Sequence, residues 1–332
     1  MSRRGRECRT CPTRVTSDCF CPSRPTTLGR EGFSLSMDRR IGLALGGGGA
    51  RGLAHLGVLI GLDEAKLPIH AIAGTSMGAV LGAARAIGAN LQLLAKLLTT
   101  LDLNALLQVS DNTLREVRKI VGRSMIEYVR GSAWRAEGAL PPDLARLNEL
   151  FSLLTARKTF AETLVPFAVV ATDVETGQRA VLDQGPICRA LTASTAVPGV
   201  FSPVAHEGRF LIDGGIVNKV PVDVVIEMGA TAVIAVDTGA PIARRVETQL
   251  EAILQAQRST SKHLTQMQLD AARRLLHDRL VILRPDVGWI RMFAFEYAEE
   301  AIQAGRASVS AHLDELAELL HGPARPTTIS EE

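Results

Sequence analysis

The stretch Ile72-Ala73-Gly74-Thr75-Ser76-Met77-Gly78-Ala79 decides how this chain folds. An apolar run ends at Gly74, Ser76 follows, and the small apolar residues beyond Gly78 predict a helix. The stretch therefore has the G-x-S-x-G pattern at a strand-to-helix turn. Side chains at either glycine would collide with the neighbouring strand and helix, so we expect a sharp turn that holds the Ser76 hydroxyl above a sheet. Taken alone, the pattern also fits a tightly packed turn without chemistry.

Composition limits the class of protein. Of the 332 residues, 46% are hydrophobic but only 4% are aromatic, so aliphatic side chains must fill a large core. The formal net charge of +2 is too small to favour a nucleic-acid partner. No uninterrupted apolar run reaches the roughly 18–20 residues of a membrane span. The length fits one large α/β domain or two small ones.

The N-terminal 37 residues differ from the rest of the chain. They hold four of the five cysteines, Cys8, Cys11, Cys19 and Cys21. Their C-x2-C-x7-C-x-C spacing matches the ligand spacing of zinc sites poorly. Acylation of these cysteines, which lie beside arginines, is another interpretation. We expect residues 1–37 to be a disordered tail, or an untranslated one if Met37 is the true start, because they offer little to bury. With one cysteine in the body, we expect a reducing cytoplasm and no disulfide framework.

Alternating strands and helices surround the serine turn. Ile41–Leu45 is a predicted strand that leads through a glycine-rich loop, Gly46–Gly52, into a predicted helix over Leu53–Leu62. With the strand Ile69–Gly74 and the helix after Ser76, this order predicts a right-handed parallel unit. Further strands are predicted at Val165–Asp173, Arg179–Leu182, Phe210–Ile212, Ala232–Asp237 and Leu280–Leu283, and further helices at Asn90–Val121, Pro186–Ala196, Pro221–Met228, Val246–His277 and Phe293–Leu320.

Residues 122–142, at the end of the segment 101–144, are less regular than their surroundings and carry Tyr128 and Trp134. We interpret the whole segment 101–144 as a helical cap over the site, with a lipid-contacting surface. An ordinary helical insertion packed on the core fits the same pattern equally well.

The glycine-rich loop has three interpretations. Gly47-x-Gly49-x-x-Gly52 satisfies the dinucleotide fingerprint, but the second strand ends without the acidic residue that would bind a ribose. The loop also lacks the Gly-Lys-Ser/Thr ending of a phosphate-binding P-loop. In the third interpretation, the N–H groups of consecutive glycines at a helix N-terminus stabilise a developing oxyanion. Neighbouring parallel strands would then place this loop beside Ser76.

A catalytic serine needs a base. None of the seven histidines follows a strand end or a glycine turn, so we expect each to be a surface or packing residue. Among the carboxylates that end apolar strands, Asp213 is distinguished by the two glycines that follow it. A partly buried carboxylate can act as the base if it hydrogen-bonds the serine directly, although a structural role for Asp213 fits as well. The histidines are His55, His70, His206, His263, His277, His312 and His321, and the other strand-end carboxylates are Asp173, Asp183 and Asp237.

Four blocks in order resemble the patatin-like phospholipase family: Gly47–Gly52, Gly74–Gly78, Ala193–Phe201 and Asp213–Gly215. The resemblance extends over about residues 39–320. Size and the Gly-Thr-Ser-Met-Gly turn most resemble its small soluble bacterial branch, akin to the esterase domain of neuropathy target esterase.

This resemblance implies a three-layer α/β/α sandwich with a mostly parallel central sheet and a Ser–Asp dyad. Ser76 would be the nucleophile and Asp213 the base, with no metal and no cofactor. The implied domain covers residues 38–321, with a disordered C-terminal tail at 322–332. The implied oxyanion-hole donors are the N–H groups of Gly48, Gly49, Ala50 and Arg51, and the supporting glycines are Gly47, Gly52, Gly74, Gly78, Gly214 and Gly215.

The function implied by the resemblance is a serine esterase or phospholipase of the carboxylic ester hydrolase class. Its substrates would be carboxyl esters of phospholipids, lysophospholipids or simpler alcohols, cleaved through an acyl-enzyme. We expect a cytoplasmic protein with peripheral contact at the inner membrane surface. Two alternatives stay open: an acyltransferase with the same nucleophile, and a non-catalytic regulatory module that binds lipid or phosphate.

Overall fold

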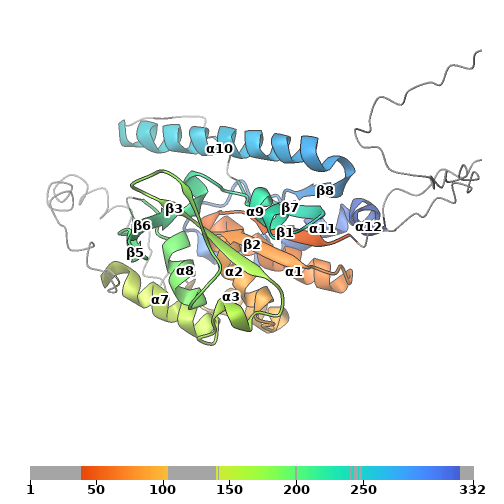
Figure 1. Ribbon diagram of the computed structural model, residues 1–332, viewed down its shortest axis with the longest axis horizontal. Helices are drawn as coiled ribbons and strands as arrows, with labels where there is room; N and C mark the ends of the chain where they lie inside the picture. Colours follow the sequence, from red (N-terminus) through yellow and green to blue (C-terminus); the bar gives the residue numbers. More distant parts are fainter. Residues whose placement is uncertain are drawn as a thin grey trace, which may run out of the picture. The chain divides into compact units, whose positions relative to one another are not determined.

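A mixed eight-stranded sheet forms the middle layer of the structure (Figure 1). Its parallel part has the order β3-β2-β1-β7-β8, and β4 and β6 both pair antiparallel with β3. β5 pairs antiparallel with β6 at the edge. The strands are β1 (Ile41–Leu45), β2 (Ala71–Thr75), β3 (Phe167–Asp173), β4 (Arg179–Leu182), β5 (Val204–His206), β6 (Arg209–Asp213), β7 (Ala232–Val236) and β8 (Leu280–Leu283).

The structure is a computed structural model that describes residues 39–103, 140, 142–198, 200–239, 241–242, 246 and 249–321. The predicted tails, the four N-terminal cysteines and most of the predicted cap lie outside these residues. No helix in the described ranges is both long enough and apolar enough to cross a membrane.

Helices cover both faces of the sheet (Figure 1). One face packs against α9 (Val222–Glu227) and α10 (Gln249–Leu276). The opposite face carries most of the other helices, including those on either side of the serine turn. The helices on this opposite face are α1 (Ala54–Glu64), α2 (Met77–Ala86), α3 (Leu91–Thr100), α7 (Pro142–Leu154), α8 (Ile187–Ser194), α11 (Ala298–Ser310) and α12 (Leu313–His321).

The two faces of the central strands divide the core in two. In β1, Leu43 and Leu45 belong to the cluster with α1, α2 and α8, whereas Ala44 belongs to the cluster with α9 and α10. Ile72 and Ala73 in β2 divide in the same way. This alternation is expected of strands whose side chains point to opposite faces of a sheet buried on both sides. The predicted three-layer α/β/α sandwich is therefore confirmed.

The structure also differs from the predicted elements in places. The single helix predicted over Phe293–Leu320 is wrong: a short 3-10 helix, η6 (Phe295–Tyr297), is followed by α11 and α12. No glycine or proline marks the break between α11 and α12, so the sequence gives no signal for it. Strand β5 was not predicted, because three residues are too few to show alternation. It joins β6 through a tight turn in which Glu207 and Gly208 have φ of 47° and 74°.

Candidate active site

Ser76 lies in a strained turn between β2 and α2. Its φ of 53° and ψ of −125° place it in a region that residues with a side chain rarely adopt. A Cβ on Gly74 would lie 2.6 Å from the Ala79 nitrogen, and one on Gly78 would lie 2.6 Å from the Gly46 oxygen. Only glycine fits both positions, so the sequence enforces the sharp turn that the G-x-S-x-G pattern predicts.

Asp213 is the carboxylate that meets this serine. It is buried at the end of β6, and its Oδ1 accepts a hydrogen bond of 2.7 Å from the Gly215 N–H. Burial raises the pKa of Asp213 to about 6, while hydrogen bonds from the Ser76 side chain and the Gly215 N–H, and the charge of Lys219, act in the opposite direction. A carboxylate with this pKa is ionised at neutral pH and is still basic enough to accept a proton.

Strand pairing explains why these two side chains meet. β3 lies between the strands that carry them: Thr75 is opposite Val170 in register, and Asp213 is opposite Ala171. The Thr172 hydroxyl donates a hydrogen bond of 2.9 Å to the Asp213 carbonyl. A Cβ on Gly214 would collide with the Val170 carbonyl, so the chain after Asp213 passes directly against β3. Val170 and Ala171, which are neighbours on β3, thus fix the two strands that carry Ser76 and Asp213.

The glycine-rich loop lies beside Ser76. It leads from β1 into a short 3-10 helix, η1 (Gly49–Leu53), and Gly49 has a φ of +58°. A Cβ on Gly47 would be 3.4 Å from the Ser76 Cβ. The Gly47 N–H donates to the Lys219 carbonyl at 3.0 Å, which fixes the start of the loop. The predicted closeness of loop and serine follows from the parallel pairing of β1 with β2.

The predicted oxyanion-hole donors differ in whether their N–H groups already have an acceptor. The Ala50 N–H donates to the Met292 carbonyl at 2.7 Å, so it is not available to a substrate in this conformation. The N–H groups of Gly48 and Gly49 have no acceptor within the described ranges. These two amides are therefore free to act as donors, unlike that of Ala50.

The Arg51 side chain holds the loop to the C-terminal part of the sheet. It is buried, and its guanidinium donates to the carbonyls of Thr238 at 3.2 Å and Ile290 at 2.9 Å. Burial, together with the charge of Arg258, lowers the pKa of Arg51 to about 10, so the group is still a cation at neutral pH. Arg51 thus joins three segments that are distant in the sequence.

His55 holds the loop from the other side. It is fully buried in α1, and its Nε2 lies 2.6 Å from the Gly46 carbonyl oxygen. Burial lowers the pKa of His55 to about 4, so the ring is neutral and donates its Nε2 proton to that carbonyl. This histidine packs under the loop, in line with the packing role expected from the sequence.

Two of the other three strand-end carboxylates have local structural partners. Asp173 accepts the Glu175 N–H at 2.9 Å, and Asp237 accepts the Gly239 N–H at 2.9 Å. Asp183 is exposed. His206 is the last residue of β5. Within the described part of the chain, no group of three or more His, Cys, Asp or Glu side chains could hold a metal ion.

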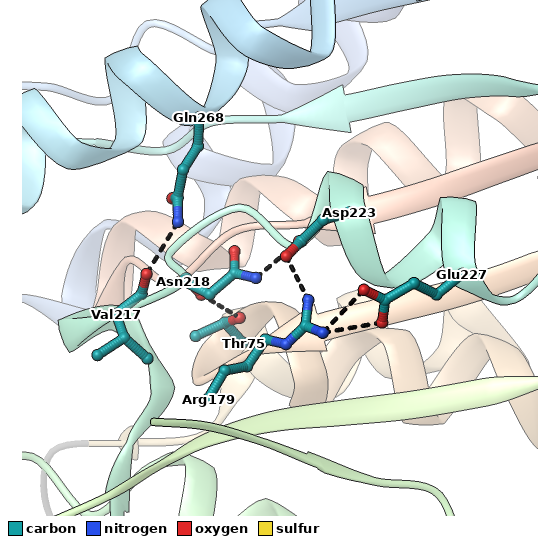
Figure 2. Close-up of polar contacts among 7 residues, drawn as sticks. All are labelled: Thr75, Arg179, Val217, Asn218, Asp223, Glu227 and Gln268. Carbon is teal, nitrogen blue, oxygen red and sulfur yellow. Dashed lines mark hydrogen bonds and ion pairs between the residues drawn. The ribbon is translucent and has the colours of Figure 1, made fainter. Parts of the chain in front are cut away.

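A polar network supports the strand that leads to the serine (Figure 2). The Thr75 hydroxyl donates to the Asn218 carbonyl at 2.9 Å, and the Asn218 amide donates to Asp223 at 2.7 Å. Arg179 from β4 pairs with Asp223 and, at 2.8 Å, with Glu227 on α9 (Figure 2). The network therefore links the residue before Ser76 to the segment after Asp213.

Ser194 at the end of α8 is a site residue that the sequence analysis did not identify. Its hydroxyl accepts the Ser76 N–H at 2.8 Å and donates to the Val170 carbonyl at 2.6 Å. The only signal in the sequence is its place in the block Ala193–Phe201.

The sequence profile described as patatin-like phospholipase matches residues 43–226, which is more than half of the chain. The chain belongs to the patatin-like phospholipase family. The matched range contains the glycine loop, Ser76, Ser194 and Asp213. The family resemblance predicted from the four blocks is therefore confirmed.

Relatives in this family include proteins much longer than the matched region. An uncharacterized NTE family protein of Mycobacterium tuberculosis is 32% identical over 201 residues, which cover 60% of this chain and 49% of that protein. Lysophospholipase NTE1 of Mycosarcoma maydis is 31% identical over 207 residues, covering 60% and 10%. The match thus spans about half the length of the mycobacterial relative. The crystal structure of VipD from Legionella pneumophila aligns with a TM-score of 0.46 and 16% identity, over 83% of this chain and 67% of VipD.

Proposed function

We propose that this protein is a serine lipid acyl hydrolase that cleaves carboxyl esters of phospholipids, lysophospholipids or simpler alcohols. The observation that carries the proposal is that the strained Ser76 turn and the buried Asp213 end two strands that both pair with β3, at its neighbouring positions Val170 and Ala171. Membership of the patatin-like phospholipase family and similarity to a protein named lysophospholipase support a lipid substrate.

In the first half of the proposed reaction, the Ser76 Oγ attacks the carbonyl carbon of the ester and its proton passes to the Asp213 carboxylate. Negative charge then develops on the carbonyl oxygen, where the N–H groups of Gly48 and Gly49 stabilise it. When the tetrahedral intermediate collapses, the C–O bond to the alcohol breaks. The leaving lysophospholipid or alcohol takes the proton back from Asp213, and the acyl group stays on Ser76.

In the second half, water attacks the acyl-enzyme and gives its proton to Asp213. The same amides stabilise the second tetrahedral intermediate. Its collapse breaks the bond to the Ser76 Oγ, which recovers the proton, and the fatty acid leaves. No histidine takes part in the proposed reaction, because Asp213 serves as the base in both halves.

Replacing Ser76 by alanine tests this proposal. Hydrolysis of short p-nitrophenyl esters and of a lysophospholipid should fall at least about 1,000-fold, because no nucleophile remains. Asp213→Asn should give a comparable loss, whereas Asp183→Asn, at an exposed strand-end carboxylate, should hydrolyse normally. Undiminished hydrolysis by the Ser76→Ala variant would show that this serine is not the nucleophile.

Two outcomes would favour the other functions considered for this chain. Transfer of the acyl group to an added alcohol, in preference to water, would indicate an acyltransferase. A wild-type protein that binds lipid but does not react with a fluorophosphonate probe would indicate a non-catalytic module.

We also propose a peripheral contact with the lipid surface through Trp289 and Tyr297. Their rings meet edge-to-face with centroids 4.9 Å apart, and their side chains are 55% and 39% exposed. Amphipathic aromatic rings of this kind favour the membrane–water interface, and the cation of Arg291, also exposed, suits a lipid phosphate. Ile290 and Met292 lie between these two aromatic residues in the sequence. Their carbonyls accept hydrogen bonds from the glycine loop, so this surface adjoins the site.

Vesicle co-sedimentation tests this contact. Trp289→Ala should reduce binding to vesicles of zwitterionic and anionic phospholipid without changing hydrolysis of a soluble ester. Met267→Ala, which removes a 70% exposed side chain from α10, is the matched control. Equal binding by the wild type and both variants would overturn the proposal. The cytoplasmic localisation stays a prediction from the cysteine distribution.

A further inference from the structure

The Ser194 hydroxyl is a fully buried group with two hydrogen bonds. It accepts the backbone N–H of Ser76 at 2.8 Å and donates to the Val170 carbonyl at 2.6 Å. A serine hydroxyl has one proton, so these roles fit together: the proton goes to the carbonyl and a lone pair takes the N–H. The hydroxyl therefore joins the backbone of the turn after β2 to the backbone of β3.

The Val170 carbonyl also lies beside the turn that follows Asp213, the other half of the proposed dyad. A Cβ on Gly214 would collide with this carbonyl, so the turn that follows Asp213 lies against it. The same added Cβ would lie 3.1 Å from the Thr75 side chain. The Val170 carbonyl on β3 thus accepts the Ser194 hydroxyl and packs against the turn that follows Asp213.

We propose that Ser194 is a positioning residue that fixes the Ser76 backbone relative to the Asp213 turn through this bridge. The inference rests on the proposed function, since it assigns Ser194 a role in the same dyad. The Ser194 hydroxyl bonds to the Ser76 N–H and to β3, so its proposed effect on the dyad is indirect.

The strain at Ser76 explains why such a bridge is needed. A residue with side chain at a positive φ persists only when its surroundings hold it there. Without the Ser194 hydroxyl, the Ser76 N–H is left buried and without an acceptor, which favours a turn that relaxes toward another conformation. The Ser76 hydroxyl would then be misplaced with respect to Asp213, and small misplacements of a nucleophile reduce the rate of the chemical step strongly.

The decisive variant is Ser194→Ala, with Thr192→Val as its matched control. Thr192 is also fully buried in α8, but its hydroxyl bonds to the Cys188 carbonyl at 2.8 Å and the Asn148 side chain at 3.1 Å, away from the serine turn. Both variants lose one buried hydroxyl from the same helix. We expect kcat for a soluble p-nitrophenyl ester to fall about 10- to 100-fold in Ser194→Ala, with little change in KM, and to stay near the wild-type value in Thr192→Val.

A pH profile separates positioning from a loss of stability. The hydrogen bond from Ser76 lowers the pKa of Asp213, so a displaced Ser76 should raise that pKa. The acid limb of kcat/KM should therefore move to higher pH in Ser194→Ala and stay in place in Thr192→Val. Ser194→Thr keeps a hydroxyl and should recover part of kcat, provided thermal melts show it folded.

The outcomes distinguish this inference from the proposed function. If wild-type protein hydrolyses esters and reacts with a fluorophosphonate probe, but Ser194→Ala has normal kcat and an unchanged acid limb, the positioning role is wrong. Equal losses of kcat in Ser194→Ala and Thr192→Val would also overturn it, because they would indicate a general effect on α8. If the wild-type protein hydrolyses no ester, the proposed function itself fails.

Discussion

At the scale of single residues, the chemistry proposed for this protein depends on the protonation of Asp213. Burial opposes its ionisation and raises its pKa to about 6. The pKa of Lys219 shifts in the opposite sense: burial and the charge of Arg51 lower it, while the charges of Asp237 and Asp213 oppose this. The base is therefore ionised only when the pH exceeds about 6, although an exposed aspartate would be ionised well below that.

This difference predicts the pH dependence of hydrolysis. Since only the carboxylate form of Asp213 can take the Ser76 proton, kcat/KM for a soluble ester should fall on the acid side with a midpoint near about pH 6. The measurement is a rate profile with stability checked at each pH. A midpoint near pH 4, the value of an exposed aspartate, would contradict the assignment of Asp213 as a buried base.

The same raised pKa predicts a gain in stability for the inactive variant Asp213→Asn. The unfolded chain loses the Asp213 proton near pH 4 and the folded chain near pH 6, so the free energy of unfolding of the wild type falls as the pH rises through this window. A difference of about two pKa units corresponds to roughly 3 kcal/mol. Asp213→Asn lacks this penalty, while its side-chain oxygen can still accept the Gly215 N–H.

Urea unfolding at two pH values tests this expectation. Asp213→Asn should be more stable than the wild type by up to roughly 3 kcal/mol at about pH 8, and the gain should vanish near about pH 4. Asp183→Asn removes an exposed carboxylate at another strand end and should show neither effect. A gain of equal size at both pH values would mean that ionisation of Asp213 is not its cause.

At the scale of elements, the glycine loop is fixed at several points, and the N–H groups of Gly48 and Gly49 have no acceptor among the residues that the structure describes. His55 bonds the Gly46 carbonyl, Arg51 bonds two carbonyls of the C-terminal part, and Met292 takes the Ala50 N–H. Donors that are held before the substrate arrives need no reorganisation when the oxyanion forms. Rigidity of this loop is therefore part of the proposed catalytic machinery.

Gly49→Ala should disturb this loop. Gly49 has a φ of +58°, and an added Cβ would collide with the Met292 carbonyl, so the loop must shift. We expect kcat to fall about 100-fold, as for the loss of one oxyanion donor. Gly177→Ala is a matched control, because Gly177 has a similar φ of +68° but a Cβ there meets nothing within 4 Å. The control should lose about 1 kcal/mol of stability and keep its kcat. Equal kcat values in the two variants would exclude a role for the loop's position.

Local patterns explain which elements could be predicted from the sequence. The serine turn, the glycine loop and the Asp213 turn each need particular residues within a few positions, so each leaves a pattern in the sequence. The hydrogen bonds from the Ser76 N–H to Ser194 and from the Ala50 N–H to Met292 join residues far apart in the chain. Such contacts depend on how the helices pack, and one sequence carries no pattern for them. Both contacts bear on the candidate site: one places Ser194 against the Ser76 N–H, and the other occupies the Ala50 N–H.

At the scale of the whole molecule, the site depends on close packing between the first helix and a late one. α1 follows the glycine loop directly, and it packs along α11 near the C-terminal end of the chain. A Cβ on Gly57 of α1 would collide with the Ile302 carbonyl, and one on Gly305 of α11 would collide with the Ala54 carbonyl. The two helix backbones therefore touch through glycines. This contact ties the end of the glycine loop to a helix more than 200 residues away in the sequence.

Gly305→Ala tests how much this contact contributes. The added methyl group has no space beside the Ala54 carbonyl, so the helices must separate, and we expect the free energy of unfolding to fall by about 2–3 kcal/mol. This loss should exceed the small gain in helix propensity from replacing a glycine within α11. Gln303→Ala, at an exposed position of the same helix, should change stability by less than about 0.5 kcal/mol. Urea unfolding measures both variants.

Because Ala54 directly follows η1, the shift should also reach the glycine loop and lower kcat under conditions where Gly305→Ala is fully folded. A variant as stable and as active as the wild type would show that α1 and α11 can separate without disturbing either the core or the site.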